Sequence, residues 1–220
     1  MGIIKEMKEA YPVYKERDPA IRSYKEVRLY PCFQAMRAYK KAHKLWLQGD
    51  YYKARKISQK AANKTGIEIH PGAVIGEGFF IDHGKGVVIG ETTEIGNNVT
   101  LYQGVTLGGT GKETGKRHPT LCDGVMVSAG AKVLGSITIG ENTKIGAGAV
   151  VLEDVPANCT VVGIPGRVVK RDNVSVPRDS MDQKFPDPVL KDLERLAKDY
   201  CSMLARLDKL EKKVNGDENL

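Results

Sequence analysis

The sequence lacks the features that mark membrane-spanning and secreted proteins. It contains no run of about 18 apolar residues, the length that a helix needs to cross a bilayer. Its first residues, MGIIKEMKEAYPVYKERD, contain no apolar core of a signal peptide. The four cysteines, Cys32, Cys122, Cys159 and Cys201, are far apart and form no CxxC pair, which argues against a zinc site or a disulfide framework. We therefore expect a cytoplasmic protein with reduced thiols.

The chain also lacks the charge pattern of a nucleic-acid-binding protein. The net charge of +7 over 220 residues is the sum of +10 in residues 1–65, −2 in residues 66–170 and −1 in residues 171–220. In the basic segment, Lys and Arg are spread among apolar residues at helical spacing, which is typical of a solvated helix face. We expect no nucleic-acid partner and no membrane partner.

Aromatic residues are scarce in the middle of the chain, where glycine is abundant. Of the 24 glycines, 21 lie between Gly66 and Gly166. Of the 14 aromatic residues, only Phe79, Phe80 and Tyr102 fall in that stretch. This asymmetry excludes a uniform fold and a chain-wide low-complexity linker.

The middle segment repeats with a period of six residues. Aliphatic residues recur at every sixth position in three series: Ile69, Ile75, Ile81; Ile89, Ile95, Leu101, Leu107; and Leu121, Val127, Val133, Ile139, Ile145, Val151. In most repeats, a small or β-branched residue follows four positions later. This period fits neither an α-helix nor simple alternation, and it is typical of a parallel β-helix built from hexapeptides. Three hexapeptides would form one triangular coil, with the aliphatic residues inside and glycines at the tight corners.

The segments on either side of the repeats differ from them and from each other. Residues 1–65 are predicted to be mainly helical, with helices over 18–48, broken at Tyr30-Pro31, and over 51–63. Residues 66–170 form the predicted β-helix, and the proline-rich residues 171–188 a linker. Residues 189–215 show apolar residues at heptad spacing, which predicts an amphipathic helix that self-associates as a coiled coil. Packing of this helix on its own subunit is the alternative.

The two interruptions of the repeat are candidate functional sites, because a regular scaffold departs from its rule mainly where function or strain requires it. Two extra residues lie between Ile81 and Ile89, and eight between Leu107 and Leu121. Each interruption contains one of the four histidines, His83 or His118. An imidazole with a carboxylate neighbour is a typical general base, which favours His83 beside Asp82. The other two histidines, His43 and His70, are expected to be structural.

The long hexapeptide series resembles that of the left-handed β-helix acyltransferases, and within that group the chain resembles the serine O-acetyltransferases. The matching segments are Arg17-Asp18-Pro19-Ala20, Ile67-Glu68-Ile69-His70-Pro71, Asp82-His83-Gly84-Lys85-Gly86, Val88-Ile89-Gly90-Glu91-Thr92, Gly104 to Lys112, and Arg117-His118-Pro119. The resemblance implies a mainly β protein, a left-handed parallel β-helix of hexapeptide repeats with helical flanks. It also implies transfer of an acetyl group from acetyl-CoA to the hydroxyl of L-serine, giving O-acetylserine and CoA.

The resemblance further implies which residues act at the site. His83 would take the proton from the serine hydroxyl, oriented by Glu68, which stands where the family has an aspartate. Asp18 and Asp82 would bind the serine ammonium group.

Arg117 would bind the carboxylate of serine, and His118 and Glu91 would line the same pocket. Backbone N–H groups near Gly108 and Gly109 are our candidates for stabilising the oxyanion.

The resemblance places the co-substrate acetyl-CoA in a groove between neighbouring prisms. The residues that match family contacts to its pantetheine and adenine portions are Gly109, Ala129 and Ala147. Electrostatics alone suggests Lys132, Lys144, Arg167 and Lys170 as candidates for its phosphates. No metal is expected.

Partners follow from the same resemblance. It implies a homotrimer, with a hexamer left open, because only about 65 residues precede the repeats. L-Cysteine would act as a feedback inhibitor at the serine site. Members that bind O-acetylserine sulfhydrylase do so through a terminal isoleucine. This chain ends in Asn219-Leu220, so we regard that complex as disfavoured, although leucine is a near substitute.

Three other functions are left open by the residues alone. One is a hexapeptide O-acetyltransferase acting on a different amino-acid or sugar hydroxyl. A second is a zinc-dependent carbonic anhydrase, which would need three histidine ligands. His70, His83 and His118 lack the expected ligand spacing. The third, a non-enzymatic scaffold, is disfavoured by the two histidine-bearing interruptions.

Overall fold

The computed structural model describes residues 2–111, 114–172, 174–175, 195–207 and 210. The chain divides into two compact units, Met1–Met181 and Asp182–Leu220, which are described separately. Among the described residues, no helix is long and apolar enough to cross a membrane.

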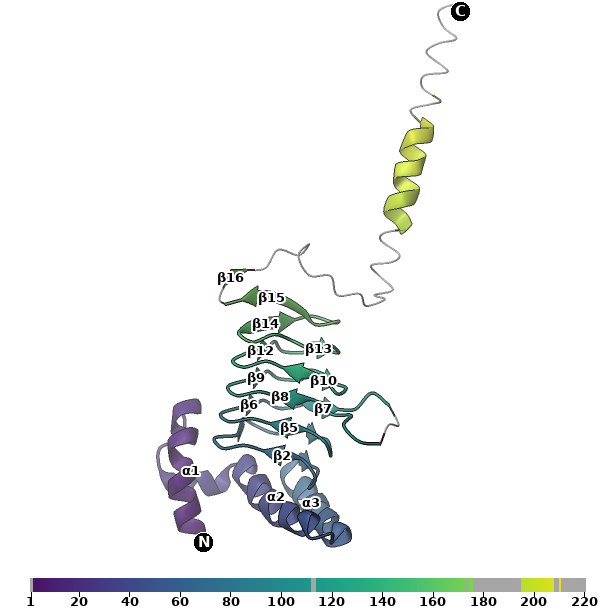
Figure 1. Ribbon diagram of the computed structural model, residues 1–220. Helices are drawn as coiled ribbons and strands as arrows, with labels where there is room; N and C mark the ends of the chain where they lie inside the picture. Colours follow the sequence, from purple (N-terminus) through teal and green to yellow (C-terminus); the bar gives the residue numbers. More distant parts are fainter. Residues whose placement is uncertain (1, 112–113, 173, 176–194, 208–209, 211–220) are drawn as a thin grey trace, which may run out of the picture. The chain divides into compact units, whose positions relative to one another are not determined.

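Short strands stacked into three parallel sheets form most of the first unit (Figure 1). Sheet A contains β1 (Ile67–Ile69), β4 (Val87–Ile89), β7 (Thr106–Gly108), β10 (Lys132–Leu134) and β13 (Val150–Val151). Sheet B contains β2 (Val74–Ile75), β5 (Glu94–Ile95), β8 (Thr120–Leu121) and β11 (Thr138–Ile139). Sheet C contains β3 (Phe80–Ile81), β6 (Thr100–Leu101), β9 (Met126–Val127), β12 (Lys144–Ile145), β14 (Cys159–Val162), β15 (Arg167–Arg171) and β16 (Val174–Ser175).

Every third strand of the repeat pairs in parallel with the one below it, which is the signature of a β-helix. In sheet A, Ile69 pairs with Ile89, Ile89 with Leu107, and Leu107 with Val133. The repeated aliphatic residues are therefore stacked in register, one coil above the next. The predicted left-handed parallel β-helix with helical flanks is confirmed.

The interior of the prism follows the six-residue period. All thirteen repeated aliphatic residues are buried except Ile75 in the first coil, which is half-buried. Most of the residues four positions later are also buried, among them Ala73, Thr93, Val99, Val105, Val125, Ala131, Thr143 and Ala149. A single coil cannot bury these side chains by itself. Stacking of the coils buries them, and this burial stabilises the β-helix.

The turns between sheets define the edges of the prism, two of which matter for function. The C–A edge consists of the turns from sheet C to sheet A, residues 82–86, 102–105, 128–131 and 146–149. The described residues of the A–B edge are 70–73, 90–93, 109–111, 114–119 and 135–137. Between β7 and β8, residues 109–111 and 114–119 belong to a loop that projects beyond the prism (Figure 1). Glycines at the C–A edge, such as Gly104 and Gly130, adopt φ near +70°, a conformation that favours glycine at these tight corners.

Four helical segments precede the strands: α1 (Ile3–Arg17), η1 (Tyr24–Leu29), α2 (Pro31–Leu47) and α3 (Tyr51–Thr65). Helix α1 was not predicted from the sequence, and the prediction of a helix from residue 18 to Tyr30 is wrong. Pro19 and Pro31 leave room there only for a turn and the 3₁₀ helix η1. In α1, Pro12 and many charged residues obscure the apolar face that buries Met7 and Tyr14.

Helices α2 and α3 cover the open end of the β-helix below β1 (Figure 1). Tyr39 on α2 donates a hydrogen bond of 2.6 Å to the carbonyl of Ala73. Ser58 on α3 donates one of 2.5 Å to the carbonyl of Ile69. These side chains satisfy polar groups of the first coil that no earlier coil could pair, as capping elements of a repeat protein must.

At the other end, strand structure continues beyond residue 170, where the sequence analysis placed the start of a linker. β15 reaches Arg171 and pairs antiparallel with both β14 and β16. Residues 176–188 of the predicted linker lie outside the described residues.

The second unit contains a helix over residues 195–207, and residue 210 is also helical. It carries part of the predicted heptad pattern, including Tyr200 and Leu207, whose side chains are exposed in the single chain. The heptad positions Val189, Leu193 and Val214 lie outside the described residues.

Candidate active site

The first interruption of the repeat forms the lowest turn of the C–A edge. It begins directly after β3 with Asp82, whose N–H donates to the Leu101 carbonyl at 2.9 Å. His83 follows with φ of 58°, a left-handed conformation, and its side chain is 75% exposed. Its Nε2 lies 4.0 Å from Oδ2 of Asp82. The turn thus presents an accessible imidazole beside a carboxylate, as a general base requires.

Asp18, the residue after the end of α1, lies near this turn. The Ala20 N–H donates to Oδ1 at 2.8 Å, and the Tyr30 hydroxyl donates to Oδ2. The hydrogen bond from Tyr30 is the main cause that lowers the pKa of Asp18, and the charge of His83 lowers it further. Asp18 is therefore an oriented carboxylate within the electrostatic reach of His83.

Arg17 anchors the end of α1 to the β-helix. Its guanidinium donates to the carbonyls of Asn98 at 3.2 Å and Val99 at 3.4 Å, and to the Thr100 hydroxyl. This clamp positions the neighbouring Asp18 relative to the prism.

Tyr30 is a further candidate site residue, and the sequence pattern did not point to it. Burial, together with its hydrogen bond to Asp18, raises the pKa of Tyr30, and the charge of Asp82 adds to this effect. Its ring packs edge-on against Tyr14, with centroids 5.0 Å apart. Tyr30 thus lies close to the two carboxylates that are predicted to bind ammonium, Asp18 and Asp82. Its place before Pro31, at a helix start, was the only sequence signal.

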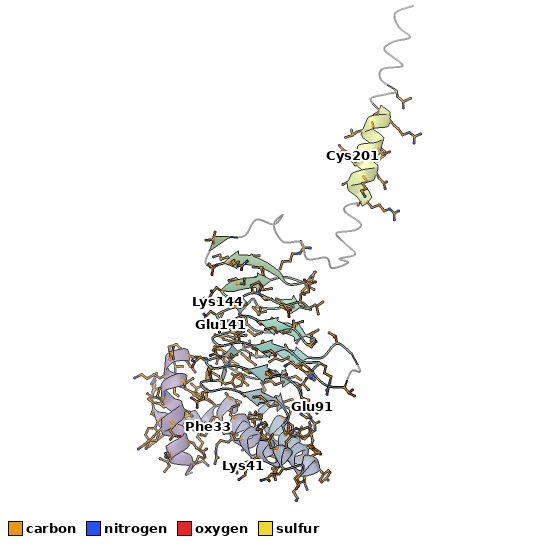
Figure 2. The ribbon with its side chains drawn as sticks, viewed as in Figure 1. Phe33, Lys41, Glu91, Glu141, Lys144 and Cys201 are labelled. Carbon is orange, nitrogen blue, oxygen red and sulfur yellow. The ribbon has the colours of Figure 1, made fainter. Side chains whose placement is uncertain are left out.

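A second group of site residues lies at the A–B edge. Arg117, from the projecting loop, forms an ion pair with Glu91, from the turn after β4. The Arg117 hydrogen bond is the main cause that lowers the pKa of Glu91. Figure 2 labels Glu91 at the base of this loop. The pair brings the two sequence segments together, and the Arg117 side chain remains 27% exposed.

His118 is held inside the same edge. Its Nδ1 accepts hydrogen bonds from the Thr92 N–H at 3.2 Å and from the Thr92 hydroxyl, 2.9 Å away. Nε2 therefore carries the proton in the neutral ring. A Cβ on Gly90 would lie 1.9 Å from Cδ2 of His118, so only glycine leaves room for the ring. Burial lowers the pKa of His118, which favours the neutral donor form.

The two remaining histidines make structural contacts. Nδ1 of His70 accepts from the Gly72 N–H at 3.1 Å, and its ring packs edge-on against Trp46 at 4.8 Å. Burial is the main cause that lowers the pKa of His70 to about 4. His43 donates from Nδ1 to the Pro71 carbonyl at 2.7 Å.

Glu68 does not form the predicted dyad with His83 in the single chain. It lies half-buried on β1, the first strand of sheet A, opposite Val88 on β4. Within the described residues, no hydrogen bond or ion pair joins its carboxylate to His83.

The candidate site is therefore divided between two edges of one prism. The C–A edge and its neighbours carry Asp18, Asp82 and His83, and the A–B edge carries Arg117 and His118. Sheet A separates the two edges, so one chain alone does not bring these residues around one small substrate.

The residues predicted to bind acetyl-CoA are also distributed. Ala129 and Ala147 lie at the C–A edge, above His83, whereas Gly109 lies at the A–B edge. Beside the first two, Gly130 and Gly148 have nothing within 4 Å of an added Cβ. This strip of small residues leaves open space for an extended, thin arm to approach the backbone, so it fits the co-substrate.

The candidate phosphate ligands occupy different surfaces. Lys132 lies on sheet A and donates to the Gly104 carbonyl at 2.7 Å. Lys144 and Lys170 are exposed and both align with Thr160 in sheet C, on β12 and β15 (Lys144 is labelled in Figure 2). Arg167 is exposed near one end of β15.

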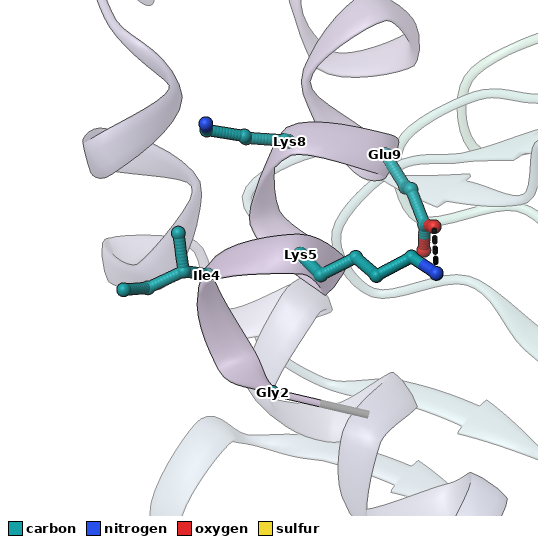
Figure 3. A pocket seen from close by; sticks show the side chains of 5 residues that line it. All are labelled: Gly2, Ile4, Lys5, Lys8 and Glu9. Atoms are coloured by element: carbon teal, nitrogen blue, oxygen red, sulfur yellow. Dashed lines mark ion pairs between the residues drawn. The ribbon is translucent and has the colours of Figure 1, made fainter.

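Two pockets lie near these elements. One, of about 350 Å³, adjoins the A–B edge and is lined by Trp46, Gly72, Val74, Glu91, Thr92, Thr93, Glu94, Gly115 and Lys116. Another, of about 570 Å³, lies on α1 and is lined by Gly2, Ile4, Lys5, Lys8 and Glu9 (Figure 3). The second pocket contains none of the predicted site residues.

The zinc alternative requires three ligands at one place. Within the described part of the chain, no three His, Cys, Asp or Glu side chains are grouped to hold a metal ion. His70 and His118 belong to the A–B edge and His83 to the C–A edge.

Comparisons with known proteins agree with this architecture. The model of the bacterial transferase hexapeptide family (six repeats) matches residues 118–153. The serine acetyltransferase of Bacillus subtilis (strain 168) is 55% identical over 210 residues, covering 95% of this chain and 97% of that protein. The crystal structure of Neisseria gonorrhoeae serine acetyltransferase has a TM-score of 0.73 and 44% identity, covering 83% of this chain and 70% of that one.

Serine acetyltransferases have also been solved in complex with serine, cysteine and CoA, with TM-scores of 0.71, 0.72 and 0.70 and identities of 44%, 42% and 40%. The stacked coils and these matches define an acyltransferase built from hexapeptide repeats. Within that class, this chain belongs to the serine acetyltransferase family.

Proposed function

We propose that the chain transfers the acetyl group of acetyl-CoA to the hydroxyl of L-serine, with His83 as general base. The observation that carries the proposed role of His83 is the turn after β3. There an exposed imidazole lies 4.0 Å from Asp82 and within electrostatic reach of Asp18. The named relatives favour serine over another amino-acid or sugar acceptor. The four free cysteines are consistent with work in a reducing cytoplasm.

In this mechanism, the chain's residues bind serine at both charged ends and remove one proton. Asp18 and Asp82 bind the ammonium group, and Arg117 binds the carboxylate. Nε2 or Nδ1 of His83 takes the hydroxyl proton as the oxygen attacks the thioester carbonyl, which typically contributes ~10²–10⁴-fold. As the C–S bond then breaks, the His83 imidazolium returns this proton to the departing thiolate of CoA. Acetyl-CoA supplies an activated thioester carbonyl. Backbone N–H groups near Gly109 are the candidates for stabilising charge on that carbonyl oxygen.

The divided site calls for more than one chain. In a cyclic homotrimer of parallel prisms, symmetry can bring the C–A edge of one chain to the A–B edge of the next. Each site would then combine Asp18, Asp82 and His83 of one chain with Arg117 and His118 of its neighbour. Glu68 on sheet A would lie between these groups.

Acetyl-CoA would bind along the same junction. The open strip beside Ala129 and Ala147 leads upward from His83, and Lys144 and Lys170 follow in line on sheet C. A related serine acetyltransferase was solved with CoA bound. We also propose that the activity does not depend on a metal ion. It should therefore be unchanged after exhaustive chelation.

A thiol-release assay with acetyl-CoA and L-serine tests the function directly. We expect CoA release that depends on serine and is far slower with homoserine or a galactoside. Release with all three acceptors alike would contradict the proposed specificity.

Mixing two inactive variants tests the shared site. His83→Asn and Arg117→Ala chains, unfolded and refolded together, should recover up to roughly a quarter of the sites, since random mixing restores one intact pair in four. Refolding each variant with itself is the control. No recovery in mixed trimers would show that each site belongs to one chain.

L-Cysteine is the proposed feedback inhibitor, since it carries the same ammonium and carboxylate groups as serine. A related structure was solved with cysteine bound. It would use Asp18, Asp82, His83, Arg117 and His118. Inhibition should be competitive with serine, and unchanged activity at millimolar cysteine would reject it.

A further inference from the structure

The helix over residues 195–207 exposes a continuous apolar face. Leu196, Tyr200, Met203, Leu207 and Leu210 are each between 54% and 64% exposed in the single chain. Their spacings of four, three, four and three residues alternate as the d and a positions of a heptad. A face of this kind is the seam of a coiled coil, in which identical side chains from neighbouring helices interdigitate.

The same face is wider than a two-helix seam. Ala197 and Leu204, at the adjoining e positions, are also exposed. Charged residues such as Lys198 and Arg206 lie beside this stripe. Apolar residues at a, d and e cover the arc that a helix buries when it has two or more neighbours, rather than one.

An isolated helix of this length is marginal in water, because packing rather than propensity supplies most helical stability. The partner with the same heptad period and the same apolar arc is another copy of this helix. In the proposed homotrimer, three copies are tethered at the same end of three parallel chains. That tether favours parallel, in-register pairing and raises the effective concentration of each helix for the others.

We propose that the described helical residues of the second unit, 195–207 and 210, form a parallel, three-stranded coiled coil with those of two other chains. This inference depends on the homotrimer of the proposed function and adds a role for the C-terminal unit. Because each active site is shared between chains, the coiled coil keeps the sites assembled when the enzyme is dilute.

Disulfide trapping tests the register. In the full-length chain with Cys201→Ser, Leu196→Cys places one thiol in the seam, and mild oxidation should give covalent dimers in high yield. The unmodified chain is the matched control, because Cys201 is exposed but occupies the b position, outside the seam. Equal or lower yield from Leu196→Cys would overturn a parallel, in-register coil.

Dilution tests the function of the coil. We expect the trimer of the double variant Leu196→Glu, Leu207→Glu to dissociate to monomers on dilution. The protein concentration at which it does so should be at least tenfold higher than that for the unmodified chain. Specific activity should fall over the same range. Lys198→Glu, off the seam, is the control.

The outcomes separate this inference from the proposed function. An active trimer whose dissociation is unaffected by the seam variant would overturn the coiled coil and leave the function intact. An unmodified enzyme that is active as a monomer would contradict the shared site and, with it, the coil.

Discussion

Tyr30 and the Ala20 N–H hold the two carboxylate oxygens of Asp18 in place, one donor to each oxygen. A carboxylate bonded in this way cannot rotate freely, and it stays ionised because the hydrogen bond from Tyr30 lowers its pKa. Tyr30 therefore acts as a positioning residue for the group that we propose binds the serine ammonium.

Tyr30→Phe should raise the KM for serine about tenfold, since a hydrogen bond to a charged group contributes ~1.5 kcal/mol or more. The KM for acetyl-CoA should change little. The pKa of Asp18 should also rise. As the pH is lowered, the variant should therefore lose serine binding at a higher pH than the unmodified chain does. Steady-state kinetics across pH measure both effects.

Tyr39→Phe is the matched control for this variant, because it removes a hydroxyl that bonds only the Ala73 carbonyl at the capping helix. Equal effects of the two substitutions on the KM for serine would show that Tyr30 acts only through stability.

His83→Asn should lower kcat by at least ~10²-fold, the usual contribution of a general base. Asparagine tolerates the left-handed backbone of this position, and the side chain is 75% exposed, so the melting temperature should hardly change. Turnover and thermal unfolding are measured on the same preparation. Near-normal turnover in this variant would remove His83 from the mechanism.

Arg117→Lys should raise the KM for serine about tenfold or more, because a lysine keeps the charge but loses the two-pronged geometry that a carboxylate accepts. Lys116→Ala, in the same loop, removes an ion pair with Glu94 and serves as control. The KM for serine is measured for both variants by steady-state kinetics with serine as the varied substrate. If both variants behave alike, the effect belongs to the loop and not to the guanidinium.

His70 makes the fold sensitive to mild acid. Its pKa is lowered to about 4 by burial, so the unfolded chain binds its proton at higher pH than the folded chain. The contribution of neutral His70 to the free energy of unfolding is complete above the usual histidine pKa of about 6.5. It is lost as the pH falls toward 4. Unfolding free energy should therefore drop between pH 7.5 and 5.5.

His70→Asn should reduce that drop, because its Oδ1 can replace Nδ1 as acceptor for the Gly72 N–H and does not titrate. Denaturant unfolding at both pH values measures the difference. An unchanged pH dependence in the variant would assign the acid sensitivity to other groups.

Two features of the helical region, α1 and the role of Tyr30, could not be predicted from the sequence. Helix α1 was missed because its buried residues, Met7 and Tyr14, contact other elements and leave only a weak pattern among charges and Pro12. Tyr30 was missed because its role depends on a hydrogen bond to Asp18, twelve residues away, across a turn and the helix η1. Such contacts follow from how segments pack, not from a local period.

The β-helix and its interior could be predicted from the six-residue period, because stacking places each sixth side chain inside the prism. The period also pointed to the two turns that carry His83 and His118, since both interrupt it. That these turns lie at different edges could not be predicted from the period and became apparent in the folded chain. A triangular coil sends successive turns to different corners, with sheet A between them. The resulting separation divides the candidate site between two edges, and for this reason we propose that neighbouring chains complete it.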